Sequence, residues 1–333
     1  GRIVTFPSVA DNLVPDDWNA WQDVFVRDRA TGTTRRLSMG VNGEANGDSL
    51  ASLVSADGST IAYSSNATNI VRGDRNRTLD VFLAGVDGTA TRRISVGAFG
   101  ESRERSEASS IDAHGRIVAF RSYAPDLVLG DANGFADVFV HDRDSDTVER
   151  VNVPTAGGEA DGVTFRGMVS GNGRYVGFRS RANNLVAHDT NDALDVFVHD
   201  RATGRTRRVS VASDGSQADG SGFARPARAS AFMSRPFLSA NGRFAAFSSR
   251  ATNLVRDDRN GKADVFVHDR LTGRTIRVSL TADGTEADED SFVAGISADG
   301  QVVAFTSLAD NLVHGDTNGR RDVFVVWLKP LLR

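Results

Sequence analysis

Short apolar segments separated by polar turns run through the whole chain. Residues 107–153 show the pattern completely: small residues alternate around an isoleucine, Ile-Val-Ala-Phe follows at 117–120, a long polar loop leads to Val-Phe-Val at 138–140, and valines alternate over 148–153. Alternation and β-branched runs of this length predict strands. Because no segment combines a 3.6-residue apolar period with helix caps, we expect four short antiparallel strands here and almost no helix.

The same pattern repeats along the chain. Its clearest part is a loop of the form Asp-x-Asn-x-x-x-Asp that runs into a Val-Phe strand, and it occurs six times at intervals of 57 to 69 residues. A fixed period of this length indicates one repeated supersecondary unit. Four-stranded antiparallel units around a ring form a β-propeller, whose strands are apolar on both faces. We therefore predict an all-β fold: a six-bladed β-propeller of four-stranded antiparallel blades, in one domain over residues 1–333.

The first and last predicted blades are incomplete in this chain. The sequence starts at the second strand of one unit and ends after the third strand of another. Either the ring closes imperfectly or the natural protein continues beyond these ends, and we expect residues before Gly1 because the matching glycine of other repeats follows an inner strand. The predicted blades cover approximately residues 1–40, 48–97, 105–154, 163–212, 232–281 and 291–328.

The six acidic loops have the ligand types of a calcium site. Carboxylate and amide oxygens at positions 1, 3 and 7 of a tight loop suit calcium, which takes about six to eight oxygen ligands in flexible geometry. Gly134, Gly261 and Gly319 permit a sharp mid-loop turn, which favours those three loops. The candidate metal ligands are Asp17, Asn19, Asp23, Asp74, Asn76, Asp80, Asp131, Asn133, Asp137, Asp189, Asn191, Asp195, Asp258, Asn260, Asp264, Asp316, Asn318 and Asp322.

The same loop residues also have a purely structural interpretation. Asp and Asn side chains accept hydrogen bonds from nearby backbone amides in Asx turns, and the last Asp can bind loop amides where the next strand begins. A further Asn or Asp recurs five residues before each loop, for example Asn69, and is a candidate fourth ligand. The sequence leaves the calcium and Asx-turn interpretations open. Magnesium fits less well because it requires a stricter octahedral geometry.

Composition excludes several classes of function. The formal net charge is −4 and the chain has no basic run, so we expect no binding of nucleic acid. The absence of cysteine excludes disulfides, thiolate metal sites and cysteine nucleophiles. Every apolar run is far shorter than the roughly 20 residues that span a bilayer, so we predict no membrane span.

The chain has no recognisable catalytic motif. Gly-x-Ser-x-Gly, His-Glu-x-x-His and a phosphate-binding Gly-rich loop with lysine are all missing. His141, His199 and His268 recur once per repeat at the end of a strand, where we expect them to face solvent and not to bind zinc. A carboxylate pair at the mouth of a propeller channel could still cleave a polysaccharide. Whether the protein is an enzyme stays open, and a non-catalytic role is favoured.

Two tryptophans are candidates for contact with a partner. Trp18 and Trp21 occur in the first acidic loop, and the other five loops have no tryptophan. Indole rings offer large rigid surfaces to a sugar or to an apolar side chain of another protein. Packing between the first and last blades is the alternative.

Four arginines are further candidates for binding. Two lie on predicted inner strands, where they either face the central channel or pair with a carboxylate of a neighbouring blade. The other two lie in an insertion at Gly222–Phe232, which lengthens one connection between repeats. These arginines are Arg166, Arg225, Arg228 and Arg235.

The repeats resemble a known family. The segment SADGSTIAYSS at 55–65 followed by LDVFLAGVDGTATRRIS at 79–95, and DGQVVAFTS at 299–307 followed by RDVFVVW at 321–327, resemble TolB-like β-propeller repeats. That family has an Asp-Gly turn before one strand and an Asp before a VFV-type strand. The resemblance covers nearly the whole chain and implies an exported, mostly non-catalytic propeller, either periplasmic or secreted. The long acidic loop departs from the simple repeat.

We therefore expect a binding or scaffold module. In a propeller, all six acidic loops lie on one face, which would engage another protein or a cell-surface polymer, with calcium as the cofactor. The alternative is a calcium-assisted lyase or hydrolase that acts on a polysaccharide at the channel mouth.

Overall fold

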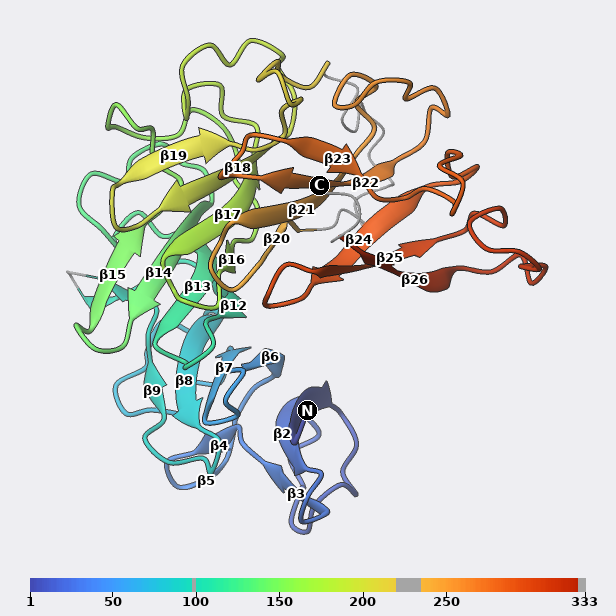
Figure 1. The fold of residues 1–333 in the computed structure, drawn as a ribbon. Coiled ribbons are helices and arrows are strands. Elements are labelled where there is room, and N and C mark those ends of the chain that lie inside the picture. Colours follow the sequence, from blue (N-terminus) through green and yellow to red (C-terminus); the bar gives the residue numbers. More distant parts are fainter. Residues whose placement is uncertain (98–99, 220–234, 329–333) are drawn as a thin grey trace. The chain divides into compact units, whose positions relative to one another are not determined.

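The computed structural model describes residues 1–97, 100–219 and 235–328 (Figure 1). These ranges contain strands, turns and loops but no helix, and so no helix long and apolar enough to cross a membrane. The chain forms two compact units. The first consists of Gly1–Val151 with Phe165–Val169, and the second of Asn152–Thr164 with Ser170–Arg333.

The first unit contains antiparallel sheets in which strands that follow each other in sequence pair side by side. One sheet has the order β1-β2-β3, and two have four strands, β6-β7-β8-β9 and β12-β13-β14-β15. Two short hairpins, β4-β5 and β10-β11, connect them. The bounds are β1 Ile3–Ser8, β2 Asp23–Asp28, β3 Thr33–Arg36, β4 Met39–Gly40, β5 Gly43–Glu44, β6 Ser49–Val54, β7 Thr60–Ser65, β8 Asp80–Gly85, β9 Arg92–Arg93, β10 Val96–Gly97, β11 Gly100–Glu101, β12 Ser106–Ile111, β13 Ile117–Ser122, β14 Asp137–Asp142, β15 Thr147–Arg150 and β16 Met168–Val169.

The second unit repeats this arrangement. Its strands follow the orders β17-β18-β19, β20-β21-β22-β23 and β24-β25-β26. The structure therefore confirms the prediction of an all-β fold that contains four-stranded antiparallel sheets. The bounds are β17 Tyr175–Ser180, β18 Asp195–Asp200, β19 Arg205–Arg208, β20 Phe237–Leu238, β21 Phe244–Ser249, β22 Asp264–Asp269, β23 Thr275–Arg277, β24 Ser291–Ile296, β25 Val302–Ser307 and β26 Asp322–Trp327.

One register recurs in every sheet that carries an acidic loop, and it places that loop. The serine that ends the strand before the loop pairs with the aspartate that begins the strand after it, as Ser8 pairs with Asp23 and Ser122 with Asp137. Two residues into the strand, an aromatic pair stacks, as Phe120 and Phe139 do with their ring centroids 5.7 Å apart. Each acidic loop therefore leaves its sheet at the same end of the strands and in the same register.

The core consists of the Val-Phe-Val strands packed on both faces. In β14, Val138, Phe139 and Val140 are all fully buried. Val24 and Leu37 of the first repeat share one buried core cluster with Ile61 of β7, so side chains of successive sheets pack together in the first unit. Strands that are buried on both faces explain why the sequence shows continuous apolar runs in place of strict alternation.

Replacing Phe139 with alanine should lower the free energy of unfolding by roughly 3–5 kcal/mol, because it removes a fully buried ring and leaves a cavity. Urea denaturation measures this loss. Phe135→Ala is the matched control, since Phe135 is 39% exposed, and should change stability by only about 0.5 kcal/mol. Equal losses for the two variants would contradict the burial of the Phe139 ring.

Candidate functional site

An arginine from the following strand occupies the first acidic loop. Arg36 Nη1 lies 2.6 Å from Asp17 Oδ1, 3.2 Å from Asp23 Oδ2 and 3.0 Å from Glu44 Oε1. The Arg36 side chain is only 5% exposed. A guanidinium group therefore lies between Asp17 and Asp23, two of the candidate calcium ligands.

Four more loops hold an arginine in the same way. Each arginine is the last residue of the fourth strand of its own repeat and lies within 2.7 to 3.4 Å of both loop aspartates. In two of these loops a glutamate from the next connection joins the cluster. The clusters are Arg93 with Asp74, Asp80 and Glu101; Arg150 with Asp131 and Asp137; Arg208 with Asp189 and Asp195; and Arg277 with Asp258, Asp264 and Glu286.

A serine two residues after the arginine completes the cluster. Ser38 Oγ donates to Asp23 Oδ1 at 2.5 Å and accepts from the Val24 amide at 3.0 Å. The same pair of bonds is made by Ser95, Ser210 and Ser279 in their repeats. Sequence reasoning missed this partner, although Arg-aliphatic-Ser recurs visibly in the chain as RLS, RIS, RVS and RVS.

The loop asparagine forms an Asx turn. Asn19 Oδ1 accepts from the Trp21 amide at 2.9 Å, and Asn19 Nδ2 donates to Asp23 Oδ2 at 3.0 Å and to the Ala45 carbonyl at 3.3 Å. The corresponding asparagines accept from the amide two residues ahead in all five other loops. This geometry matches the structural interpretation of the loops, and calcium binding stays a prediction.

Glycine in the middle of a loop serves the backbone. Gly134, Gly261 and Gly319 have φ values of 71°, 64° and 59°, and Ala20, Arg77 and Asp192 occupy the same left-handed region in the other loops, with φ between 51° and 58°. Glycine adopts this conformation without the steric cost that a side chain brings. The three glycine loops therefore have the same backbone turn as the other three.

Several of the asparagines five residues before a loop bind the connection that precedes their repeat. Asn69 Nδ2 donates to the Glu44 carbonyl at 2.7 Å, and Asn69 Oδ1 accepts from the Asn46 amide at 3.0 Å. Asn184 and Asn311 make the equivalent pair of contacts. These side chains fix one repeat to the connection before it, so their printed bonds are structural.

The clusters concentrate buried negative charge. Burial and the charge of Asp264 raise the pKa of Asp258 to about 6, against the lowering effect of Arg277. Burial likewise raises the pKa values of Asp74 and Asp189 to about 6 against the opposing effect of their arginines. One guanidinium therefore only partly offsets the cost of burying two or three carboxylates.

Both tryptophans of the first loop project into solvent from a fixed backbone. The Trp18 side chain is 81% exposed and Trp21 is 45% exposed. The Trp18 amide donates to Glu44 Oε1 at 2.8 Å, and the Trp21 amide donates to Asn19. The loop therefore holds two indole rings outward without restricting access to them.

The structure places two of the four candidate arginines. Arg166 is paired with Glu107, with Nε 3.1 Å from Oε2, which fits the paired alternative. Arg235 is half-buried, and burial together with the charge of Arg235 lowers the pKa of Arg179 to about 10. The other two, Arg225 and Arg228, lie outside the described residues, as does the whole Gly222–Phe232 insertion.

The prediction that the three repeated histidines face solvent is wrong. His141, His199 and His268 are only 3% to 6% exposed, because the third strand of each sheet is covered on both faces. His199 Nδ1 lies 3.0 Å from Thr206 Oγ1 on the neighbouring strand, and His268 makes the same contact with its own threonine. Burial lowers the pKa of His268 to about 4.

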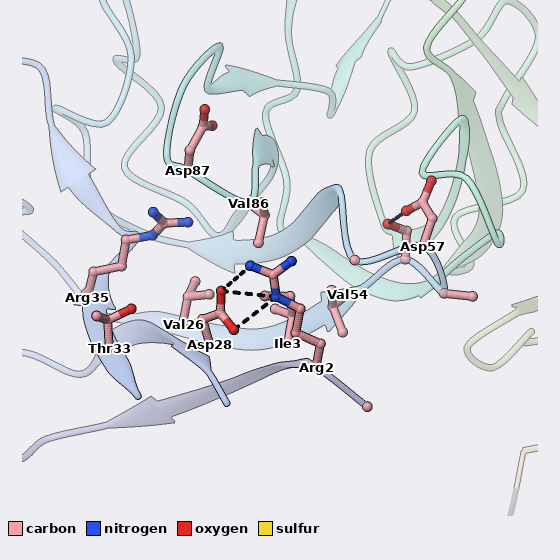
Figure 2. A pocket seen from close by; sticks show the side chains of 14 residues that line it. Arg2, Ile3, Val26, Asp28, Thr33, Arg35, Val54, Asp57, Val86 and Asp87 are labelled. Atoms are coloured by element: carbon pink, nitrogen blue, oxygen red, sulfur yellow. Dashed lines mark hydrogen bonds and ion pairs between the residues drawn. The ribbon is translucent and has the colours of Figure 1, made fainter. Parts of the chain in front are cut away.

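The first unit also contains a cavity of about 670 Å³ (Figure 2). Arg2 lines it and donates from Nε and Nη2 to Asp28, at 3.0 and 2.7 Å, which lowers the pKa of Asp28 to about 2. Arg35 and Asp87 line the same cavity. Because Ile3 pairs with Asp28, this cavity lies at the end of β1 and β2 opposite the acidic loop. The predicted site residues do not line it.

Comparison with known proteins supports the fold. No protein-family model matches the chain, and no curated protein matches its sequence. The β-propeller domain of the trilobed protease from Pyrococcus furiosus matches 98% of this chain and 79% of its own, with 10% identity and a TM-score of 0.54. An acylaminoacyl peptidase from Pyrococcus horikoshii matches 98% of this chain and 43% of its own, with 11% identity and a TM-score of 0.53.

TolB from Acinetobacter baumannii is also similar, with 14% identity over 87% of this chain and a TM-score of 0.42. The chain spans 58% of the length of that TolB. The two matches with TM-scores above 0.5 support the β-propeller fold that the repeats implied. A fold shared at these identities does not fix an activity.

Removing the arginine from one cluster should be far more damaging than removing one of its acids. Arg277→Met leaves the carboxylates of Asp258, Asp264 and Glu286 buried without their counter-charge and should cost about 3–5 kcal/mol at pH 7, measured by urea denaturation. Asp258→Asn keeps the arginine paired and should cost much less. Equal losses would show that the guanidinium does not hold the cluster together.

The stability of the protein should also depend on pH through Asp258. Its pKa is about 6 in the folded protein, above the ordinary value of 3.8, so protonation favours folding. This contribution is complete below the ordinary value and is lost as the pH rises through 6. Urea curves should therefore show Asp258→Asn gaining stability relative to wild type between pH 4 and pH 7. A constant difference across that range would contradict the raised pKa.

Proposed function

We propose that this protein is a non-catalytic binding or scaffold module: an exported, six-bladed propeller that engages another protein or a cell-surface polymer through the loop end of its sheets. The observation that carries the proposal is the pair of exposed indoles, Trp18 and Trp21, on a rigid loop. Exposed aromatic side chains held in place before binding lose little conformational entropy in a complex. The extracytoplasmic location rests on the resemblance to TolB-like repeats.

The repeated charged residues support binding over catalysis. In the first five loops, both aspartates pair with an arginine from the same repeat. The asparagine between them closes an Asx turn. These residues shape the loop backbone, and this leaves the side chains between them free to vary and to contact a partner.

The third loop offers a second exposed aromatic group. Tyr123 is 45% exposed and Phe135 is 39% exposed, and both lie near the ends of the strands that the loop connects. Arg121 fixes the tyrosine, with its guanidinium carbon 4.7 Å from the ring centroid and Nη2 donating to the hydroxyl at 3.0 Å. A partner that binds this end of the first unit would meet rigid aromatic surfaces on more than one sheet.

Replacing Trp18 and Trp21 with serine should abolish binding and leave the fold intact. Surface plasmon resonance against a panel of cell-envelope polysaccharides and envelope proteins should show at least a tenfold loss of affinity for whichever ligand binds the wild type. The melting temperature should barely change, because exposed side chains contribute within about 0.5 kcal/mol. Leu271→Ser is the control and should keep the wild-type affinity, since Leu271 is 74% exposed and lies in the turn between β22 and β23, at the sheet end opposite the acidic loop.

Two results would overturn this proposal. Affinity that is unchanged in the double tryptophan variant would show that the first loop is not the binding surface. Cleavage of any polysaccharide in the panel that disappears in Arg166→Ala would support the lyase or hydrolase alternative in place of a binding module.

Calcium is a separate part of the proposal. In five loops an ion would have to displace the guanidinium group, so we propose Asp316, Asn318 and Asp322 as the preferred site, because no described residue places an arginine between those carboxylates. A ligand that binds only the folded state at 100 times its dissociation constant adds about 2.7 kcal/mol of stability. Calcium should therefore raise the melting temperature of the wild type but not of Asp316→Asn. An unchanged melting curve after chelation and after calcium addition would remove calcium from the proposal.

A further inference from the structure

Four turns at one end of the second unit form a continuous surface, which we call the arginine end. They lie at the sheet ends opposite the acidic loops and consist of residues 170–174, 201–204, 239–243 and 270–274. Within one sheet the turns are hydrogen-bonded, since the Arg270 amide donates to the Arg243 carbonyl at 2.9 Å. Between the sheets, the Asn172 amide donates to the Ala240 carbonyl at 2.9 Å. The four turns therefore present their side chains together.

These turns carry an excess of positive charge. They contain no acid and five arginines, namely Arg174, Arg201, Arg243, Arg270 and Arg274. The matching turns of the first unit contain five acids and only two arginines, over residues 55–59, 86–91, 112–116 and 143–146. Positive charge is therefore a property of this end of the second unit and not of the repeat itself.

Two of the five arginines share their charge with an aspartate. Arg174 Nε and Nη2 donate to the Asp200 carboxylate, both at 2.7 Å. Arg243 makes the same bidentate pair with Asp269, at 2.9 and 2.7 Å. In this described part of the chain, no other acid belongs to the four turns or to the strand ends that they join. Because arginine stays protonated, the arginine end keeps a net positive charge at neutral pH.

Arg270 lies in a shallow hollow of this surface. The hollow has a volume of about 310 Å³, and its lining residues are Tyr175, Asn241, Arg243, Arg270 and Leu271. The guanidinium carbon of Arg270 lies 4.2 Å from the ring centroid of Tyr175. Burial lowers the pKa of Arg270, and the like charge of Arg207 lowers it further, against the effects of Tyr175 and Asp200. An anion in the hollow would meet Arg270 and Arg243 together and offset this repulsion.

The turns also present neutral hydrogen-bond donors beside the arginines. Asn241 Oδ1 accepts from the Arg243 amide at 3.0 Å and from Ser239 Oγ at 2.9 Å, so its Nδ2 group is left as a donor. Asn172 makes the same two bonds in its own turn, and both asparagines are exposed. Guanidinium and amide donors together match a chain that carries both anionic groups and hydroxyl groups.

Other partners fit this surface less well. Single-stranded RNA binds through aromatic rings that are open for base stacking, but Phe244 is buried and the Tyr175 ring lies against two guanidinium groups. A membrane surface or a protein partner needs apolar contacts, and within these four described turns only Leu271 is large, apolar and exposed. An acidic saccharide needs only the arginines and the amides.

We propose that the arginine end binds an acidic polysaccharide, a sugar chain with carboxylate or sulfate groups. One anionic group would pair with Arg270 and Arg243 in the hollow, and further groups along the chain would meet the arginines of the neighbouring turns. Guanidinium groups bind such anions by paired hydrogen bonds, and several contacts along one chain reinforce each other. The arginine end belongs to the second unit, so this proposal does not rest on Trp18 and Trp21 of the first.

Fluorescence anisotropy with the full chain in EDTA measures binding of a labelled oligouronate, and a sulfated oligosaccharide of the same length in a second arm distinguishes carboxylate from sulfate. Saturable binding of at least one of the two is expected. The affinity should fall as salt is added, because the contacts join exposed charges. The methyl ester of the oligouronate has no charge and should bind at least tenfold more weakly than the acid.

Two arginines that make the same kind of ion pair give a matched comparison. Arg243 pairs with Asp269 at the arginine end, and Arg116 pairs with Asp142 at the equivalent end of the first unit. Their side chains are 40% and 51% exposed. Arg243→Gln should weaken binding of the acidic oligosaccharide at least tenfold, whereas Arg116→Gln should keep the wild-type affinity. The melting temperatures of the two variants should be close, because each loses one partly exposed pair.

A second variant at the arginine end guards against misfolding of Arg243→Gln. Arg207 on β19 is exposed, and its side chain makes no hydrogen bond to any described residue. Arg207→Gln therefore removes one positive charge beside Arg270 and leaves the hydrogen bonds of the turns in place. It should weaken binding of the acidic oligosaccharide while the melting temperature stays near that of the wild type.

Several results would overturn the inference. No binding of either acidic oligosaccharide, or equal binding of the methyl ester, would remove it. Equal losses in Arg243→Gln and Arg116→Gln would show that net charge alone attracts the chain. Tighter binding of a single-stranded RNA with as many charges, or of vesicles that contain anionic lipid, would make that partner the occupant.

The double tryptophan variant separates this surface from the proposed binding loop. An acidic oligosaccharide bound at the arginine end should keep its affinity in that variant and lose it in Arg243→Gln. The opposite response would place the contact at the first acidic loop and overturn the present inference. Failure of the loop surface and failure of the arginine end can therefore be told apart.

Discussion

The loop end of each of the first five repeats depends on one buried ion cluster, a guanidinium group shared by two aspartates. Removing these charges from water is costly, and the cost is recovered only where each charged atom finds a well-placed partner. Arg36 meets this condition by contacting Asp17, Asp23 and Glu44 together, while the second oxygen of Asp23 accepts from Ser38. The path of the loop backbone follows from these bonds, because the loop must bring two carboxylates to the same guanidinium.

In the first unit, the cluster also couples one repeat to the next. Glu44 belongs to the hairpin β4-β5, which leads from the first sheet into the second, and its side chain reaches back to Arg36 and to the Trp18 amide. Its carbonyl accepts from Asn69 in the loop of the following repeat. A single residue thus connects the ion cluster of one sheet to the loop of its neighbour in the first unit. The same residue fixes the backbone of Trp18, because the Trp18 amide donates to the Glu44 carboxylate.

The opposite end of the sheets has a simpler ion pair, an arginine with one aspartate, and the two residues are present or absent together. Arg2 and Asp28 form a bidentate pair beside the cavity of Figure 2. Arg116, Arg174 and Arg243 each pair in the same way with an aspartate at the end of the third strand. Where the arginine is replaced by Ser59, the register places a glycine, Gly85, at the aspartate position. Both charges are lost together, as expected when one alone would have no partner.

The sequence by itself determined the repeat, the all-β class and the position of the acidic loops. Strand periodicity and the spacing of Asp-x-Asn-x-x-x-Asp are local properties of the chain. It also identified the loop residues that matter, but it left two meanings for them, calcium ligands or Asx turns. The recurring Arg-aliphatic-Ser was visible and its role was not, since Arg277 lies 13 residues after Asp264 and meets it only when β23 pairs with β22. Burial of His268 could not be read either, because coverage of both sheet faces comes from segments distant in sequence. Only the tertiary structure decided which charge fills each of the first five loops, because this depends on contacts between strands.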